Sequence, residues 1–338
     1  MQIIPIEAIG AEAWDRAISG FESRLLFHRS AWLSFLEETQ SGITVRFKIV
    51  QDGRIVGFFV GILMKKGFLK ILGSPLATWL TDYMGPLFNP GFDQEVFLLE
   101  LHALCRRWKI HTLEIGNPFL DQSTMQKHGF RCSQWNVYGI PVSSDIDDMW
   151  KNLTGKCKNR IRKGYSNELV VEDCVDPAFV DEHYDQLLEV FAKQRRLPEY
   201  SLQTIRSLYE NLKHENLLLT LRVQYKGRTI ATGMFPHDDR FVFSFGIASR
   251  TEFQKLCPNE LLYWTVMSIA GQAGLKEFYI GGVYKTPESG GLFKKKFNGR
   301  DMVVYRYIKN YSVFATAGRK IYKYAYHAKR KLKDRLLT

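Results

Sequence analysis

Three consecutive lysines stand between two phenylalanines near the end of the chain, shortly after two glycine pairs. The segment, residues 281–300, reads GGVYKTPESGGLFKKKFNGR and follows the apolar run EFYI. Gly281 and Gly282 permit a sharp turn and the close approach of another group, which a Cβ would block. Phe293 and Phe297 are four residues apart, so both can anchor one face of a helical turn and direct one lysine. A lysine held in this way can bind a phosphate or stabilise negative charge that develops in a transition state.

A second basic cluster lies in the segment GKCKNRIRKG, residues 155–164. Its cations are Lys156, Lys158, Arg160, Arg162 and Lys163. Because an arginine can hold two oxygens of a phosphate or carboxylate at once, this segment, which we predict to be helical, is a candidate anion site. For both clusters the alternative interpretation is a charged surface that faces solvent.

The charge and cysteine content narrow the class of protein. The chain has 338 residues and a formal net charge of +12, which predicts attraction to nucleic acid, anionic lipid or the phosphates of a substrate. The longest apolar run, IVGFFVGILM, is shorter than the roughly 18 residues of a spanning helix. The amino terminus lacks a basic region before its apolar residues, so we expect a cytoplasmic protein. Five scattered cysteines without a C-x-x-C pair predict a reducing compartment and no metal site.

The elements around these clusters form one α/β unit used twice. The segments FKIVQDGRIVGFFVGILMKKG and LRVQYKGRTIATGMFPHDDRFVFSFG each predict a hairpin, with turns at Gly53 and Gly227. Each hairpin is followed by a helical pattern and a short strand, over residues 95–115 and 260–280. We therefore expect an α/β protein with mixed central sheets flanked by helices.

Polar segments and helix caps predict where the helices begin and where the two domains meet. Helices open both halves, with Ser30 and Ser201 as candidate N-caps. An acidic, polar stretch places the boundary near residue 145 and gives domains 1–145 and 146–312. Residues 313–338 predict a basic amphipathic helix, which can lie on an anionic membrane surface. Packing of its apolar stripe on the body of the protein is the alternative.

Five motifs of the second half occur in a characteristic order: KNRIRKG, GRTIATGMF, PNELLYWTVMSIAGQAG, YIGG and GGLFKKKFNG. This order resembles the FemAB-like branch of the GNAT acyltransferase superfamily, as do FHRSAWLSFLEE and LGSPLATWLTDYMGPLF in the first half. That branch includes peptidoglycan bridge-forming aminoacyl transferases and acetyltransferase-like proteins of exopolysaccharide synthesis. The resemblance covers residues 25 to 310. It implies two tandem GNAT-like domains and the transfer of an acyl group to an amine or a hydroxyl.

The resemblance also implies roles for single residues. Lys294 corresponds to the lysine that stabilises the reacting carbonyl or binds donor phosphate, with Phe293 beside it. Gly281 and Gly282 correspond to the glycine pair of the donor site. The basic motif that can bind an acceptor diphosphate falls on the second basic cluster, and we take as its residues Lys158, Arg160, Arg162 and Lys163.

Two departures from the family pattern affect the choice of the catalytic base and of the acyl donor. Tyr279 stands where many relatives have an aspartate, so no family aspartate can serve as base. The segment RTEFQKLC replaces the Gly-rich pyrophosphate loop, so the helix that starts at Pro258, with Arg250 or Lys255, would have to hold the phosphates of CoA. Residues 179–213 leave no room for a long coiled-coil arm, which favours an acyl-CoA donor over aminoacyl-tRNA.

Direct acyl transfer also requires a base and a proton donor. Candidate bases are Glu260, Asp238, Asp239 and Glu288, and Tyr284 or Tyr279 can protonate the leaving group. We select Glu260 and Tyr284.

The sequence thus predicts an N- or O-acyltransferase that acts on a cell-envelope or exopolysaccharide precursor at the inner membrane face. An aminoacyl-tRNA-dependent transferase and a non-catalytic protein that binds nucleic acid or anionic lipid are the alternatives.

Overall fold

The computed structural model describes residues 1–76, 80–198, 200–282, 291–312 and 316. The chain forms two compact units. Unit 1 contains residues 1–135 and the described residues from 303 onward, and unit 2 contains residues 136–302. Two strands, β7 (Arg131–Pro141) and β14 (Arg300–Asn310), have residues in both units.

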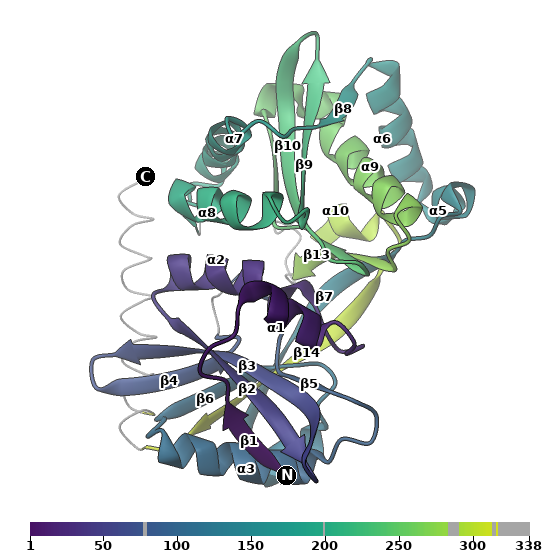
Figure 1. Ribbon diagram of the computed structural model, residues 1–338. Coiled ribbons are helices and arrows are strands. Elements are labelled where there is room, and N and C mark those ends of the chain that lie inside the picture. The colour runs from purple at the N-terminus through teal and green to yellow at the C-terminus, as the bar shows by residue number, and fades with distance from the viewer. Residues whose placement is uncertain (77–79, 199, 283–290, 313–315, 317–338) are drawn as a thin grey trace. The chain divides into compact units, whose positions relative to one another are not determined.

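Unit 1 is a mixed sheet with helices on both faces (Figure 1). Its strand order is β1-β2-β3-β4-β6-β14, and only β4 and β6 are parallel. The strands are β1 (Gln2–Pro5), β2 (Ile43–Gln51), β3 (Arg54–Lys66), β4 (Leu69–Ser74), β5 (Pro86–Phe88), which pairs with β3, and β6 (Thr112–Gly116). The helices are α1 (Ala11–Ile18), the short 3-10 helix η1 (Leu26–His28), α2 (Ser30–Gln40), α3 (Gln94–Arg107) and α4 (Gln122–Lys127). In Figure 1, α1 and α2 lie on one face of this sheet and α3 lies on the other.

Unit 2 contains an antiparallel sheet of order β12-β10-β9-β8 and a group in which β13 pairs with β11 and β7. The strands are β8 (Val170–Asp173), β9 (Leu218–Tyr225), β10 (Arg228–Pro236), β11 (Phe241–Phe243), β12 (Gly246–Ser249) and β13 (Glu277–Gly282). The helices are α5 (Ile146–Asn152), α6 (Gly155–Ser166), α7 (Phe179–Lys193), α8 (Leu202–Lys213), the 3-10 helix η2 (Thr251–Leu256), α9 (Pro258–Gln272) and α10 (Gly291–Lys295). Helices α7 and α8 cover one face of β8–β10, and α6 and α9 cover the other (Figure 1).

The two hairpins form as predicted, and their turns explain why. Asp52 and Gly53 have φ values of 50° and 76°, and Lys226 and Gly227 have values of 50° and 75°. Two successive left-handed residues are the signature of the tight turn whose twist matches that of the flanking strands. The turns therefore fix the register of β2 with β3 and of β9 with β10.

One of the two predicted helix caps is confirmed and the other is wrong. Ser201 accepts a hydrogen bond from the backbone N–H of Thr204 and caps α8. Ser30 is instead the first residue of α2, whose N-cap is Arg29. The backbone N–H of Ser30 donates to the carboxylate of Asp15, 2.8 Å away, so a long-range contact replaces the local cap.

The two halves of the chain exchange their last strands. Residues 137–141 of β7 pair with β13 in unit 2, and residues 306–310 of β14 pair with β6 in unit 1. The units consequently differ from the expected domains 1–145 and 146–312. Unit 2 begins inside β7, and the residues after 302 return to unit 1.

Some expectations fall outside the described residues: Tyr284, Glu288 and the helix expected over 313–338, apart from Thr316. None of the helices within the described ranges is long and apolar enough to cross a membrane. The five cysteines are free thiols. Among residues with a described position, no group of His, Cys, Asp or Glu side chains could hold a metal ion.

Candidate active site

One segment of unit 2 passes from one sheet to another at Ser244 and Phe245. The backbone N–H of Ser244 donates to the carbonyl oxygen of Tyr279 in β13, at 2.7 Å. The next N–H, of Phe245, donates to the carbonyl oxygen of Met234 in β10, at 3.0 Å. The chain therefore pairs first with β13, as the parallel strand β11, and then with β10, as the antiparallel strand β12. Ligands of α/β proteins bind beyond the carboxyl ends of parallel strands at such switch points.

Gly281 and Lys294 lie together at the carboxyl end of β13. Gly281 has a φ of +70°, a value that side chains rarely tolerate. A Cβ built on Gly281 would stand 3.8 Å from the Nζ atom of Lys294. The group that comes close to this glycine is thus the half-buried lysine of α10.

An aromatic cluster holds α10 against α9. The rings of Phe293 and Phe297 are 5.6 Å apart, and each centroid is 5.3 Å from the ring of Tyr263. The hydroxyl of Tyr263 lies 3.3 Å from the hydroxyl of Ser244 at the sheet switch. Burial raises the pKa of Tyr263 to about 12, so its phenol stays protonated. The two phenylalanines anchor the lysine segment as predicted and tie it to the switch.

The three lysines of this segment have different surroundings. The Nζ atom of Lys296 lies 2.8 Å from Oε1 of Glu260 and 4.8 Å from the ring centroid of Phe293. Lys295 is exposed, whereas Lys294 is half-buried beside the end of β13. Lys296 is therefore an internal ion-pair partner, and Lys294 faces the candidate site.

Glu260 is the buried carboxylate at the centre of an ion cluster. Its side chain is 4% exposed and accepts hydrogen bonds at Oε1 from Lys296 and from Arg160 of α6, the latter at 3.2 Å. Two cations therefore share one oxygen of this carboxylate. The structure brings Glu260 and Arg160 together at the start of α9. From the sequence, Glu260 was expected to be a base and Arg160 to bind the acceptor.

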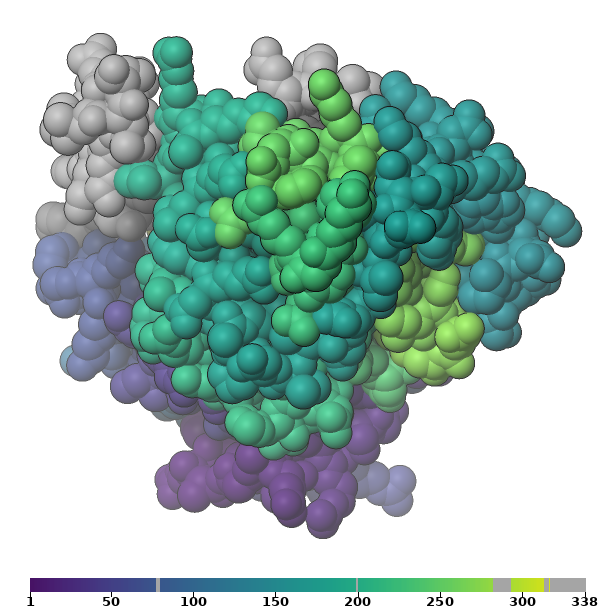
Figure 2. Space-filling model, turned by 90° about the horizontal axis from the view of Figure 1, so that it is seen from above, coloured from purple at the N-terminus to yellow at the C-terminus, as the bar shows by residue number. Residues whose placement is uncertain are grey.

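The same cluster fixes α10 to α6. The carbonyl oxygen of Lys296 accepts hydrogen bonds from the hydroxyl and the backbone N–H of Thr154, at 2.9 and 3.2 Å. Thr154 is also the N-cap of α6, since its hydroxyl accepts from the N–H of Cys157. In Figure 2 the yellow residues around α10 lie directly beside the teal residues of α5 and α6. The basic clusters predicted from the sequence are thus neighbours in unit 2.

The other residues expected to bind an acceptor make local contacts. Lys158 donates to the carbonyl oxygen of Lys151, at 2.9 Å. The guanidinium of Arg162 lies 5.4 Å from the ring centroid of Trp150, and Lys163 is exposed. Of the basic residues expected in α6, Arg160 is the one that joins the ion cluster.

Arg250 and Lys255 were both expected to bind donor phosphates, but their surroundings differ. Arg250 is paired with Asp185 and Glu189 of α7, at 2.5 and 3.2 Å. Lys255 is exposed in η2, directly before α9. The charge of Arg250 is therefore balanced by α7, whereas Lys255 and Arg160 lie near the first turn of α9.

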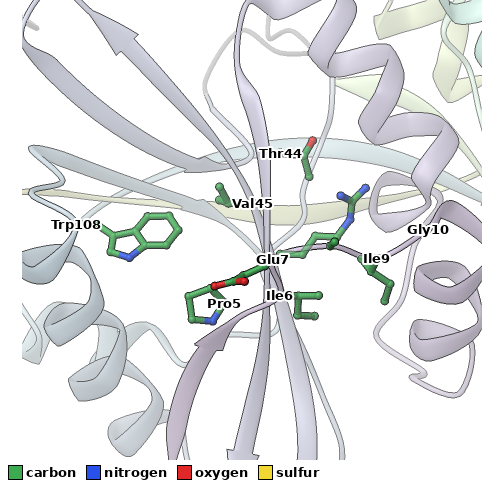
Figure 3. Close-up of a pocket in the computed structure, with 10 residues that line it drawn as sticks. Pro5, Ile6, Glu7, Ile9, Gly10, Thr44, Val45 and Trp108 are labelled. Carbon is green, nitrogen blue, oxygen red and sulfur yellow. The ribbon is translucent and has the colours of Figure 1, made fainter.

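Unit 1 has a separate groove of about 850 Å³ that contains none of the expected site residues. In Figure 3, Trp108 lies on one side of it and Ile9 and Gly10 lie on the other. Its one arginine, Arg46, is 5.3 Å from the ring centroid of Trp14. Burial lowers the pKa of Arg46, against the opposing effect of nearby carboxylates. We assign no part of the reaction to this groove.

Comparisons with known proteins bear on the fold of the chain. Residues 151–289 match the family model of the acetyltransferase (GNAT) domain. The crystal structure of FemX matches with a TM-score of 0.71 and 12% identity, over 90% of this chain and 97% of that one. A tandem GNAT protein from the clavulanic acid biosynthesis pathway has a TM-score of 0.53 and 9% identity, over 91% and 98% of the two chains. L-PGS from Bacillus licheniformis has a TM-score of 0.53 and 12% identity, over 91% and 94%. A search of curated protein sequences found no match.

These findings show a GNAT acetyltransferase domain over residues 151–289 and, for the chain, the fold of a tandem GNAT protein. The likeness to FemX in fold agrees with the fold that the motif order of the chain implied. An enzyme is therefore favoured over a non-catalytic protein that binds polyanions.

Proposed function

We propose that the protein transfers an acyl group from an acyl-CoA directly to an amine or hydroxyl of a cell-envelope or exopolysaccharide precursor. The observation that carries this proposal is the position of Lys294 beside Gly281, at the end of β13 and next to the sheet switch. A thioester carbonyl in this place would have an ammonium group close to the oxygen on which negative charge develops.

The proposed donor site uses the first turn of α9. Unsatisfied N–H groups and the helix dipole make such a terminus suitable for phosphate, and Arg160 and Lys255 add positive charge there. Strand β12 is an edge strand of the four-stranded sheet, so its backbone can pair with the amides of an extended pantetheine arm. This arm would bring the thioester toward the switch.

Each residue of the site has a proposed role in the transfer. The acceptor nitrogen or oxygen attacks the thioester carbon, the C–S bond breaks, and the thiolate takes up a proton. The proton that the acceptor loses passes to solvent water, from which the proton donor is restored. Lys294 stabilises the oxyanion, and Tyr284 donates the proton to the leaving thiolate. Glu260 acts as a positioning residue because it holds Arg160 and α10 in place.

A second candidate is the same transfer with aminoacyl-tRNA as donor. The likeness to FemX and the net charge of +12 favour it, since tRNA is a polyanion. The described residues between β8 and β9 form helices of ordinary length, α7 and α8, with 15 and 12 residues, and no long helical arm, which favours the CoA thioester.

Binding and turnover with both donors distinguish the two candidates. Acetyl-CoA and longer acyl-CoAs should raise the melting temperature, because a ligand that binds only the folded state stabilises it. They should also release free thiol when amino sugars or other hydroxyl-bearing sugars are supplied as acceptors. If no thioester stabilises the protein while aminoacyl-tRNA donates its aminoacyl group, the second candidate replaces the first.

A further inference from the structure

The groove of about 850 Å³ in unit 1 lies at the edge of the sheet, where β1 is shorter than its partner β2. Strand β1 ends at Pro5, opposite Phe47, so residues 43–46 of β2 extend beyond it. One more hydrogen bond, from the N–H of Ile6 to the carbonyl oxygen of Arg46, follows at 2.9 Å. Residues 7–10 then leave β2 and lead to α1, and the groove lies between them and the strand.

Side chains from both faces of β2 line this groove. Successive residues of a strand point to opposite faces of the sheet, and in Figure 3 Val45 is turned toward Trp108 whereas Thr44 is turned the other way. Most of the lining is apolar: Pro5, Ile6, Ala8, Ile9, Val45 and Trp108. A bound molecule can therefore bury an apolar part here.

Arg46 carries the one positive charge among the described lining residues. Its guanidinium is 5.3 Å from the ring centroid of Trp14, a contact that leaves the N–H groups without an acceptor. Within the described part of the chain, this half-buried side chain makes no hydrogen bond and no ion pair. Its Nε atom is buried, but its two terminal nitrogen atoms are not, so a ligand in the groove can reach them. Two such nitrogens suit the two oxygens of a carboxylate.

The carboxylates that lie near Arg46 have other partners. Asp15 pairs with Arg29, at 3.0 Å. Glu37 of α2 accepts a hydrogen bond from the backbone N–H of Thr44, at 2.5 Å. This second contact also caps an N–H group at the open edge of β2, so the edge is poorly suited to the addition of another strand. The groove is therefore better suited to a small molecule than to an extended peptide or a second copy of the sheet.

The charges around the groove favour an anion with a single negative charge. Helix α1 begins beside it at the N-cap Gly10, which supplies no side-chain hydrogen bond to the first N–H groups of the helix. Glu7 on the groove and Glu12 in the first turn are exposed carboxylates that would repel a second negative charge. We infer that the groove binds a small monocarboxylic acid, whose carboxylate is held by Arg46 and whose apolar part lies against the groove lining. None of the residues assigned to acyl transfer lines it, so this site is separate from the reaction.

NMR of the full chain labelled with ¹⁵N-arginine tests the inference at the residue itself. The Nε–H signal of Arg46 is assigned from its loss in Arg46→Gln. The probes are benzoate and hexanoate, with benzamide as a neutral compound of the shape of benzoate and inorganic phosphate as an anion without an apolar part. We expect at least one of the two acids to shift the signal saturably, and benzamide and phosphate to leave it in place. If neither acid shifts it, or if benzamide or phosphate shifts it equally, the inference is overturned.

Calorimetric titration of the acid that shifts Arg46 measures the contribution of the charge. Arg46→Gln should weaken binding by about tenfold, as expected for a lost charged hydrogen bond. Lys48→Gln is the matched control, because Lys48 lies two residues further along the same face of β2 and outside the groove. Equal losses in the two variants contradict the proposed role of Arg46.

A pair of variants at Gly10 keeps the test independent of the contact between Arg46 and Trp14. Gly10 has a φ of −66°, and a Cβ there meets nothing within 4 Å, so asparagine and aspartate both fit and can both cap α1. Only Gly10→Asp adds a negative charge to the groove, and it should weaken binding of the acid by about threefold. Gly10→Asn should keep the wild-type affinity. Equal affinities of the two variants overturn the inference.

Discussion

The ammonium group of Lys294 lies 3.8 Å from the point that a Cβ of Gly281 would occupy. The two residues meet at the carboxyl end of β13, next to the strand that changes sheets at Ser244 and Phe245. Gly281 adopts a left-handed backbone conformation and has no side chain, so the ammonium group of Lys294 can lie close to the backbone there. This relationship carries the proposed chemistry.

Gly281→Ala should lower both stability and turnover. A side chain at a φ of +70° costs about 1–2 kcal/mol in the free energy of unfolding, and the new methyl group would contact Lys294. Gly53→Ala is the matched control, with a φ of +76° and no atom within 4 Å of its Cβ. Denaturant unfolding should show similar losses for the two variants, with turnover reduced in Gly281→Ala alone. Equal turnover in both would separate Gly281 from the site.

Glu260→Gln should destabilise the protein by about 2 kcal/mol, because Lys296, whose side chain is 15% exposed, loses its counter-charge. Arg160 adds little to this loss, since its side chain is 42% exposed and water can solvate it. Glu252→Gln is the comparison, since the ion pair of Glu252 with Arg228 is exposed on both sides and contributes about 0–1 kcal/mol. Urea unfolding measures both. A Glu260→Gln protein with full stability and no turnover would contradict the positioning role and restore Glu260 as a base.

Arg160→Gln should weaken the binding of acetyl-CoA by about tenfold, because the donor phosphates lose a charged hydrogen bond at the start of α9. Its binding of acetyl-S-cysteamine, a thioester without phosphates, should stay unchanged. Arg250→Gln should alter neither affinity, because Arg250 is paired with Asp185 and Glu189. Calorimetric titration of both thioesters gives the comparison, and a selective loss in Arg250→Gln would reverse the assignment.

Stability should fall in mild acid because of His183, which is fully buried on α7. Its pKa is about 3 in the folded protein and about 6.5 when unfolded, so between these values only the unfolded chain binds the proton. Stability therefore decreases as pH falls below about 6.5, and this residue accounts for about 2 kcal/mol between pH 7 and pH 5. Unfolding of the wild type and of His183→Asn at both pH values gives the difference. Parallel losses in the two proteins would show that His183 is already solvated or protonated when folded.

The sequence predicts much of the fold because its signals are local. The turn glycines Gly53 and Gly227 specify both hairpins, and the periodic apolar residues of α3 and α9 specify the helices that follow. The exchange of β7 and β14 was missed, since strand partners far apart in the chain leave no local pattern.

The candidate site was predictable only in part, for the same reason. Phe293 and Phe297 pointed to an anchored lysine, and their spacing of four predicted the packing on one side of α10. That Lys296 meets Glu260, and that Arg250 pairs with α7, depends on contacts between residues more than 30 positions apart.

The most direct measurement is the rate of acyl transfer by Lys294→Ala beside Lys295→Ala, with the acyl-CoA that best stabilises the wild type. Lys295 is the exposed neighbour on the same helix, so both variants lose one positive charge from α10. We predict that Lys294→Ala lowers kcat/KM by about 100-fold or more at an unchanged melting temperature, as expected for a lost oxyanion contact, and that Lys295→Ala keeps the wild-type rate. Equal rates in the two variants would contradict the account.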